Sequence, residues 1–241
     1  MVTPVNGTHE SVVFRGCHPS GNDGYGVGMR ASVAVLRVAA AVAILVAVVG
    51  QWESSLRDPG YRFVDFFGYF TIQSNLIALL ALLIGALTVL RRTPPPRWTV
   101  AIRAGATTYI ALTGLVFNLV LAGLPSTDPY TLGWASDVFH RVIPLYVVLD
   151  WLVFADRDRQ PWRRVGQFVA FPLVWLVVVL ARGADFVPYP FLDVAALGGG
   201  VVALWCGGIA VAVALIGALV VAASRVRLLD PDRAVPQRSG S

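Results

Sequence analysis

The sequence contains no lysine, and charged residues of all kinds make up only 14% of its 241 residues. An average soluble domain carries about 25% charged residues. Hydrophobic residues reach 56%, which is more apolar surface than one soluble core of this size can bury. The composition therefore excludes an ordinary soluble domain and predicts an integral membrane protein. In such a chain the net charge of +5 reports membrane topology and gives no reason to expect a nucleic-acid partner.

The sequence also lacks the motifs of several enzyme classes. It has no GxSxG nucleophile elbow and no HExxH helix, so serine hydrolases and zinc proteases are not indicated. Its two cysteines, Cys17 and Cys206, are too few for a disulfide framework or a metal cluster. His140 is the only histidine inside an apolar stretch, which argues against a metal site. We therefore expect neither a metal nor another cofactor.

Six apolar stretches are long enough to cross a bilayer core of about 30 Å, which takes about 20 helical residues. They cover residues 31–50, 66–90, 100–122, 136–154, 166–181 and 197–222. The sequence thus predicts an all-α membrane protein, a bundle of six transmembrane helices.

Arginine is distributed unevenly around these stretches. Thirteen arginines fall in the N-terminal tail, the loops after the second and fourth stretches and the C-terminal tail, whereas the alternate loops hold three. Loops rich in Lys and Arg remain in the cytoplasm. Both termini are therefore predicted to be cytoplasmic, with the chain in the plasma membrane.

The chain divides into one membrane domain and two polar tails. We expect residues 1–29, polar and rich in glycine, to form a disordered cytoplasmic tail, and Met29 is an alternative translation start. Residues 30–224 form the transmembrane domain, and residues 225–241 form a charged cytoplasmic tail.

Polar residues at the outer ends of three stretches form a first candidate site. Helical rise places Thr71, Asn118 and His140 at a common depth, about 6–7 Å below the outer boundary. A threonine in a membrane helix usually bonds to its own helix carbonyl, and a lone histidine is more often structural than catalytic. Their common depth favours a functional role for the pair. Asp137 could orient His140 or form an ion pair with Arg141.

Three charged residues near the cytoplasmic boundary form a second, inner layer. Arg37, Arg103 and Asp150 lie within about 10 Å of that boundary by helical rise. Buried charges in a membrane need partners. We therefore expect a structural ion pair of Asp150 with Arg37 or Arg103, in preference to ion translocation.

Four motifs in order resemble those of a bacterial six-helix membrane protein family. They are YFTIQSN at 69–75, FNLVL at 117–121, HRVIP at 140–144 and LDWLVF at 149–154. That family is more distantly similar to the androgen-induced protein family, multipass hydrolases that cleave fatty acid esters of hydroxy fatty acids with an intramembrane Thr and His. The resemblance implies these roles for Thr71 and His140.

The residues are chemically suited to that reaction. A neutral histidine can take the proton of a threonine hydroxyl and later protonate the leaving alcohol. Asn75, Asn118 and Arg141 are candidate donors to the oxyanion. The leading hypothesis is a Thr–His hydrolase of lipid-like esters at the outer leaflet, with membrane lipids as its surroundings. A membrane transporter or a lipid-binding protein that uses the same polar layer is the alternative, and a purely structural membrane protein is a third possibility.

Overall fold

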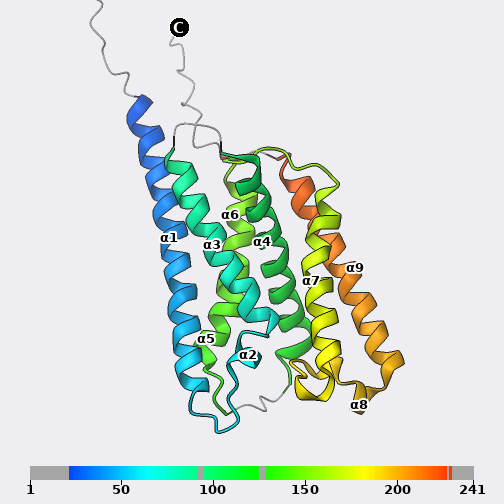
Figure 1. Ribbon diagram of the computed structural model, residues 1–241. Coiled ribbons are helices and arrows are strands. Elements are labelled where there is room, and N and C mark those ends of the chain that lie inside the picture. The colour runs from blue at the N-terminus through cyan, green and yellow to red at the C-terminus, as the bar shows by residue number, and fades with distance from the viewer. Residues whose placement is uncertain (1–21, 92–94, 125–128, 227, 230–241) are drawn as a thin grey trace, which may run out of the picture.

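A computed structural model of the chain describes residues 22–91, 95–124, 129–226 and 228–229. Most of these residues are helical, and the part described contains no strand, only an isolated bridge between Phe154 and Leu229. The helices lie side by side as a bundle (Figure 1). The all-α fold class is therefore confirmed.

Five helical segments of the described chain are long and apolar enough to cross a membrane. They are Val27–Ser55 within α1 (Asn22–Ser55), Phe70–Leu90 (α3), Arg97–Leu121 (α4, Arg97–Val116, continued by the π-helix η1, Phe117–Leu121), Arg164–Asp185 (α7, Arg164–Arg182, continued by η3, Gly183–Asp185) and Gly199–Ala223 (α9). The chain is thus a helical membrane protein.

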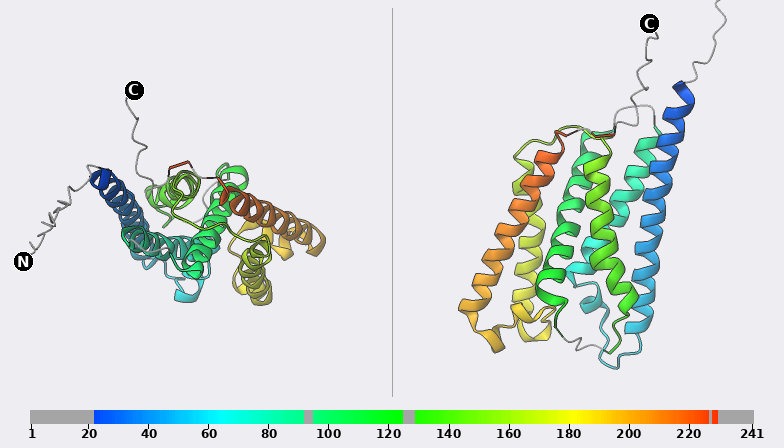
Figure 2. Two further views of the ribbon diagram at one scale, coloured as in Figure 1. Left: turned by 90° about the horizontal axis from the view of Figure 1, so that it is seen from above. Right: turned by 180° about the vertical axis from the view of Figure 1, so that it is seen from behind.

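The predicted stretch 136–154 corresponds to a continuous helix in three parts. These parts are α5 (Gly133–Asp137), the π-helix η2 (Val138–Val142) and α6 (Ile143–Val153). The composite helix runs along the whole bundle beside α3 and α4 (Figures 1 and 2). The first described residues of α1 and the last residues of α9 lie at the same end of the bundle.

Two element boundaries differ from the sequence prediction. Helix α1 begins at Asn22, so the disordered tail expected over 1–29 is wrong for residues 22–29; Asn and Asp, present at 22 and 23, are typical of helix starts. Residues 1–21 and 230–241 lie outside the described part. The second stretch begins at Phe70 rather than at residue 66, because the separate turn α2 (Phe63–Phe66) and Gly68 precede it.

Helix α4 lies at the centre of the bundle, between α1 and α3 on one side and α7 and α9 on the other (Figure 2). Its buried residues are mostly small, including Gly105, Ala106, Thr108 and Gly114. Small side chains let helix backbones approach closely in a membrane, where close packing replaces the hydrophobic effect. The neighbouring helices therefore pack closely against the backbone of α4 at the centre of the bundle.

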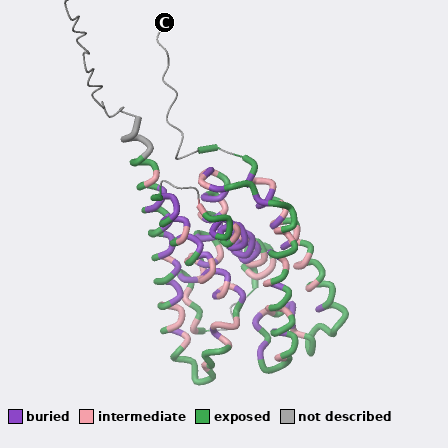
Figure 3. The backbone as a smooth tube through the Cα atoms, turned by 45° about the horizontal axis from the view of Figure 1, so that its top comes forward, coloured by how far each residue is buried: buried purple, intermediate pink, exposed green. Residues whose placement is uncertain are grey.

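Many residues of the long helices are exposed (Figure 3). The exposed residues include many large apolar ones, as the surface of a membrane protein does. Helices α7 and α9 are the least buried of the five described apolar helices, and in α9 the side chains of Leu204, Leu215 and Leu219 are all exposed. A Cβ at Gly207 or Gly208 of α9 would meet open space, so these two glycines do not serve close packing between the described helices. Gly217 alone of the described α9 glycines lies against a neighbouring helix.

At the end of the bundle where α3 begins, the connection between α7 and α9 packs onto α2. This connection contains η3, η4 (Pro190–Leu192) and α8 (Val194–Leu197). Arg62 donates to the Asp185 carbonyl of η3. In α7, Arg182 forms an ion pair with Asp65, and the Trp175 indole N–H donates to the Gly68 carbonyl over 2.8 Å. Burial acts to raise the pKa of Asp65, but hydrogen bonds from Arg182 and Arg62 outweigh it and lower the pKa. These contacts bring the connection over the start of α3.

Candidate active site

The structure brings Thr71 and His140 into hydrogen-bond contact. Thr71 lies in the first turn of α3, and His140 lies in the π-helix η2. The distance from Thr71 Oγ1 to His140 Nε2 is 3.2 Å. This is the contact that a nucleophile and its general base require.

The other imidazole nitrogen determines the proton arrangement of this pair. His140 Nδ1 lies 2.8 Å from the Ser136 carbonyl oxygen, and a carbonyl can only accept, so Nδ1 carries the proton in the neutral ring. Nε2 then presents its lone pair to Thr71, and the Thr71 hydroxyl donates to it. The Phe117 ring stacks on the imidazole at 3.9 Å between centroids, which fixes the plane of the imidazole ring.

A third polar side chain, Tyr189, contacts Thr71 twice. The Thr71 backbone N–H donates to the Tyr189 hydroxyl over 3.3 Å, and the two side-chain hydroxyls lie 3.2 Å apart. Tyr189 comes from the connection between α7 and α9, where its ring stacks on Phe191 with 5.3 Å between centroids. Burial raises the pKa of Tyr189 to about 12, so the phenol is protonated at neutral pH.

Both π-helices lie at this site, and Pro144 accounts for the contact between them. Proline has no N–H, so the carbonyl of His140, four residues earlier, loses its helical donor. The Asn118 side-chain amide replaces that donor, at 2.9 Å from the His140 oxygen. Gly114 permits the close approach, since a Cβ there would lie 2.7 Å from Pro144 Cβ. Short π segments are frequent at functional sites.

The three predicted oxyanion donors are engaged elsewhere. The Asn75 amide donates to the Thr71 carbonyl over 2.9 Å. The Asn118 amide donates to Gly114 and His140 carbonyls. Arg141 forms an ion pair with Asp137 and donates to Asn118 Oδ1. Of the two roles considered for Asp137, the structure shows the ion pair, while the Ser136 carbonyl orients His140.

Thr71, His140 and Tyr189 line one end of a largely apolar pocket. Its walls come from α3, α4, η1, α7 and α9. Along α4 and η1 it extends from Leu112 to Leu121, a distance of about 13 Å at helical rise. An elongated apolar cavity with a few polar groups at one end suits a molecule with a hydrocarbon chain and one polar group.

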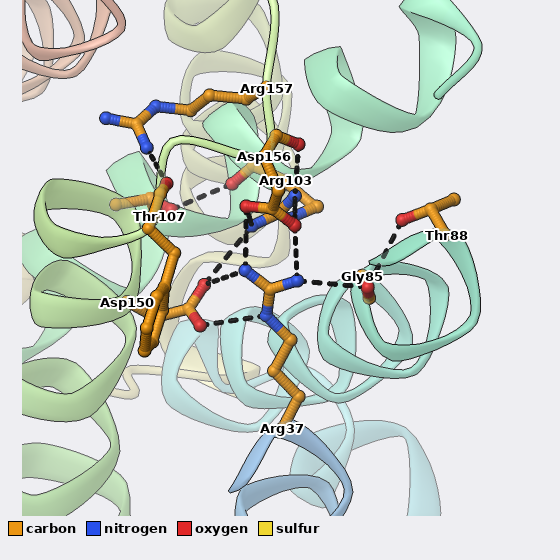
Figure 4. Close-up of polar contacts among 9 residues, drawn as sticks. Arg37, Gly85, Thr88, Arg103, Thr107, Asp150, Asp156 and Arg157 are labelled. Atoms are coloured by element: carbon orange, nitrogen blue, oxygen red, sulfur yellow. Dashed lines mark hydrogen bonds and ion pairs between the residues drawn. The ribbon is translucent and has the colours of Figure 1, made fainter. Parts of the chain in front are cut away.

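The predicted inner layer forms a buried four-residue ion network at the opposite end of the bundle (Figure 4). Arg37 contacts Asp150 at 2.8 Å, and Arg103 contacts it at 3.2 Å. Both arginines also reach Asp156, from the connection after α6. The network joins α1, α4 and α6 with two positive and two negative charges. Gly85 leaves room for it, since a Cβ there would lie 3.1 Å from Arg103 Nε.

Two residues in the connection after α6, next to this network, have strongly shifted pKa values. Burial acts to raise the pKa of Asp156, but Arg103 and Arg37 outweigh it and hold the pKa well below its usual range. Burial lowers the pKa of Arg157 to about 10. Arg157 donates to the Ala223 and Val226 carbonyls, and so caps the end of α9.

Sequence reasoning missed Tyr189, Ser136 and Asp156. Tyr189 lies between Pro188 and Pro190 in a connection outside the apolar stretches, and Asp156 belongs to a run of alternating charges that is typical of a solvated loop. The only available signal for Ser136 was its position four residues before His140, on the same helix face. Among the described residues, no three His, Cys, Asp or Glu side chains gather to hold a metal ion.

The fold and the site define a class, a helical membrane protein with a Thr–His–Tyr cluster at the end of an apolar pocket. No protein family, no curated protein and no solved structure matches the chain.

Proposed function

We propose that the protein is an intramembrane hydrolase of lipid-like esters, with Thr71 as nucleophile and His140 as general base. The observation that carries this proposal is the 3.2 Å contact from Thr71 Oγ1 to the unprotonated His140 Nε2 at the polar end of an apolar pocket. The resemblance of four motifs to the bacterial six-helix family, and through it to the androgen-induced family, supports the same assignment.

In the proposed reaction, Thr71 Oγ1 attacks the ester carbonyl carbon while its proton passes to His140 Nε2. The carbonyl π electrons move to oxygen, and the oxyanion collapses to expel the alcohol oxygen, which takes the proton from Nε2. The acyl group is then esterified to Thr71. A water molecule then attacks this ester and gives a proton to Nε2. The second tetrahedral intermediate collapses, which returns the proton to Oγ1 and releases the fatty acid. The acyl chain occupies the apolar pocket throughout.

The proposal includes the membrane arrangement. The composite helix Gly133–Val153 is the sixth span, both termini are cytoplasmic, and the protein resides in the plasma membrane. The site then opens toward the outer leaflet. The excess of arginine in the alternate loops supports this orientation.

Activity-based labelling tests the chemistry. Purified protein is treated with an alkyl fluorophosphonate, and the modified residue is identified by mass spectrometry in the wild type, Thr71→Ala and His140→Ala. We expect labelling at Thr71 that His140→Ala abolishes. Thr108→Ala is the matched control, because Thr108 is a buried threonine whose hydroxyl donates to its own helix carbonyl. A folded wild type that is not labelled would contradict the proposal and favour lipid binding or transport by the same pocket.

Cysteine accessibility tests the topology. Asp58 and Arg159 are exposed and lie in the connections after α1 and after α6. In a variant without Cys17 and Cys206, Asp58→Cys should react with a membrane-impermeant maleimide on intact cells. Arg159→Cys should react only after the cells are permeabilised, and the reverse pattern would contradict the orientation.

A further inference from the structure

The proposed reaction develops a negative charge on the ester carbonyl oxygen, and that charge needs a fixed hydrogen-bond donor. The amide protons of Asn75 and Asn118 donate to backbone carbonyls. Arg141 is exposed, paired with Asp137 and absent from the pocket wall. The predicted donors therefore do not face the carbon that Thr71 would attack.

Thr113 also lines the pocket, but its hydroxyl is already engaged in hydrogen bonds. Its Oγ1 donates to the Tyr109 carbonyl over 3.0 Å and lies 2.8 Å from Ser74 Oγ. Ser74 in turn bonds the Thr71 carbonyl. The two hydroxyl protons are taken up by these helix carbonyls and by the contact between the two hydroxyls, and are not directed at a ligand.

Tyr189 is the remaining donor at the nucleophile. Its oxygen accepts the Thr71 backbone N–H, and its own proton is directed to Thr71 Oγ1, because Oγ1 donates to His140. The ring is held by the Phe191 stack and by edge contact with Tyr69 at 6.0 Å. Pro190 restricts Tyr189 to extended backbone, as its φ of −139° and ψ of 140° show. The donor is therefore positioned before substrate binds.

The hydrogen bonds change when the nucleophile attacks. Oγ1 becomes bonded to the acyl carbon and is a weaker acceptor than the adjacent oxyanion, which is bonded to the same carbon. The Tyr189 proton can reach that oxyanion by rotation about the phenolic C–O bond. The hydroxyl thus donates to the nucleophile before attack and to the developing charge during it.

We infer that Tyr189 is a catalytic residue that donates its phenolic proton as a hydrogen bond to the oxyanion of the tetrahedral intermediate. This inference rests on the proposed Thr71–His140 chemistry and adds the residue that stabilises its charged intermediate. No proton is transferred, so Tyr189 remains neutral throughout.

The experiment compares wild type, Tyr189→Phe and Tyr146→Phe in hydrolysis of a p-nitrophenyl fatty acyl ester. Tyr146→Phe is the matched control, because this hydroxyl is also buried but has no hydrogen-bond partner among the described residues. Two inhibitors of equal chain length complete the design. An alkyl trifluoromethyl ketone forms a tetrahedral oxyanion on the nucleophile, and the corresponding methyl ketone only occupies the pocket.

We expect Tyr189→Phe to lower kcat by about 10²–10³-fold, as loss of an oxyanion donor does, with KM close to that of the wild type. Its affinity for the trifluoromethyl ketone should fall, while its affinity for the methyl ketone and all constants of Tyr146→Phe should not change. If Tyr189→Phe fails to fold, fluorotyrosine at 189 keeps the ring and strengthens the donor, so kcat should change with fluorination.

Two outcomes overturn the inference while leaving the proposed function in place. The first is wild-type turnover by Tyr189→Phe, or turnover independent of fluorination. The second is an equal loss of affinity for both ketones, which would make Tyr189 a residue that shapes the pocket. A folded wild type that neither hydrolyses the ester nor is labelled at Thr71 would instead overturn the proposed function, and the inference with it.

Discussion

At the scale of single residues, the candidate site contains a side-chain hydrogen bond that replaces a backbone hydrogen bond lost at a proline. Pro144 deprives the His140 carbonyl of its helical donor, and the Asn118 amide supplies another at 2.9 Å. This bond lies at the outer surface of the bundle, and a carbonyl that faces lipid without a donor costs about 1–3 kcal/mol. Asn118 therefore supports the backbone of His140, the proposed general base, in place of the oxyanion role that its depth predicts.

This role predicts coupling between Asn118 and Pro144. Asn118→Ala should lower the free energy of unfolding by about 1–3 kcal/mol, since the His140 carbonyl loses its donor. It should also slow Thr71 labelling, because the imidazole is no longer held in place. Pro144→Ala restores an N–H at 144, so the double variant should be more stable than the sum of the single changes indicates.

Denaturation in detergent measures the coupling, and the labelling rate at Thr71 gives the functional readout. Strict additivity of the two changes would contradict the role assigned to Asn118.

The residues that sequence reasoning could find are those whose position is set by a single helix. Thr71 and His140 meet in the structure, as their common predicted level suggested, because helical rise fixes the level of a residue once the helix ends are known. Tyr189 depends instead on the fold of a connection that crosses the end of the bundle and reaches α3 from 118 residues away. The periodicity of residues along one helix does not predict such a contact.

At the scale of elements, the contact between α4 and the composite helix depends on Gly114. A Cβ at this position would lie 2.7 Å from Pro144 Cβ and 3.3 Å from the His140 carbonyl oxygen. Both of these atoms belong to a backbone or ring that cannot rotate away. The two helices can therefore lie this close together only because Gly114 has no side chain.

Gly114→Ala should destabilise the protein by about 1–3 kcal/mol, the usual cost of overpacking, and should separate His140 from Thr71. Gly105→Ala on the same helix is the matched control. Its Cβ would make ordinary contacts, 3.5 Å from Phe168 and 3.6 Å from Tyr109. That variant should be neutral or gain about 0.5–1 kcal/mol from helix propensity.

Thermal unfolding in detergent, with Thr71 labelling as the activity readout, distinguishes the two glycines. Equal effects of the two alanines would show that α4 and the composite helix can separate without loss, contrary to the packing described.

The long helices follow closely from sequence because lipid imposes their length and apolarity. The predicted stretch 166–181 lies within α7, and 197–222 differs from α9 by two residues at its start. The π segments could not be predicted in this way. They depend on the pairing of Pro144 with Gly114 and Asn118, which are more than twenty residues away on another helix.

At the scale of the whole molecule, the ion network ties three helices and one connection together at the end opposite the candidate site. Arg37 is fully buried, and Arg103 and Asp150 are 5% and 6% exposed. Removing one member leaves an unpaired buried charge, which costs about 3–5 kcal/mol. The network therefore acts on the stability of the bundle and does not touch the reacting groups.

The lowered pKa of Asp156 makes this stability depend on pH. A carboxylate whose pKa is lower in the folded than in the unfolded state stabilises the fold above its unfolded value of about 3.9. That contribution is lost as the pH falls below this value toward the folded pKa. The melting temperature in detergent should therefore fall between neutral pH and about pH 3, and Asp156→Asn should remove much of that fall while lowering stability at neutral pH.

Asp158→Asn is the matched control, because Asp158 is exposed on the same connection. This variant should keep the pH dependence of the wild type. Thr71 labelling per folded molecule should remain near the wild-type rate in both variants, since the network stabilises the bundle without contacting the nucleophile. Equal melting curves for Asp156→Asn and wild type at neutral pH would contradict the structural role of the network. Loss of labelling in a fully folded Asp156→Asn would instead couple the two ends of the bundle.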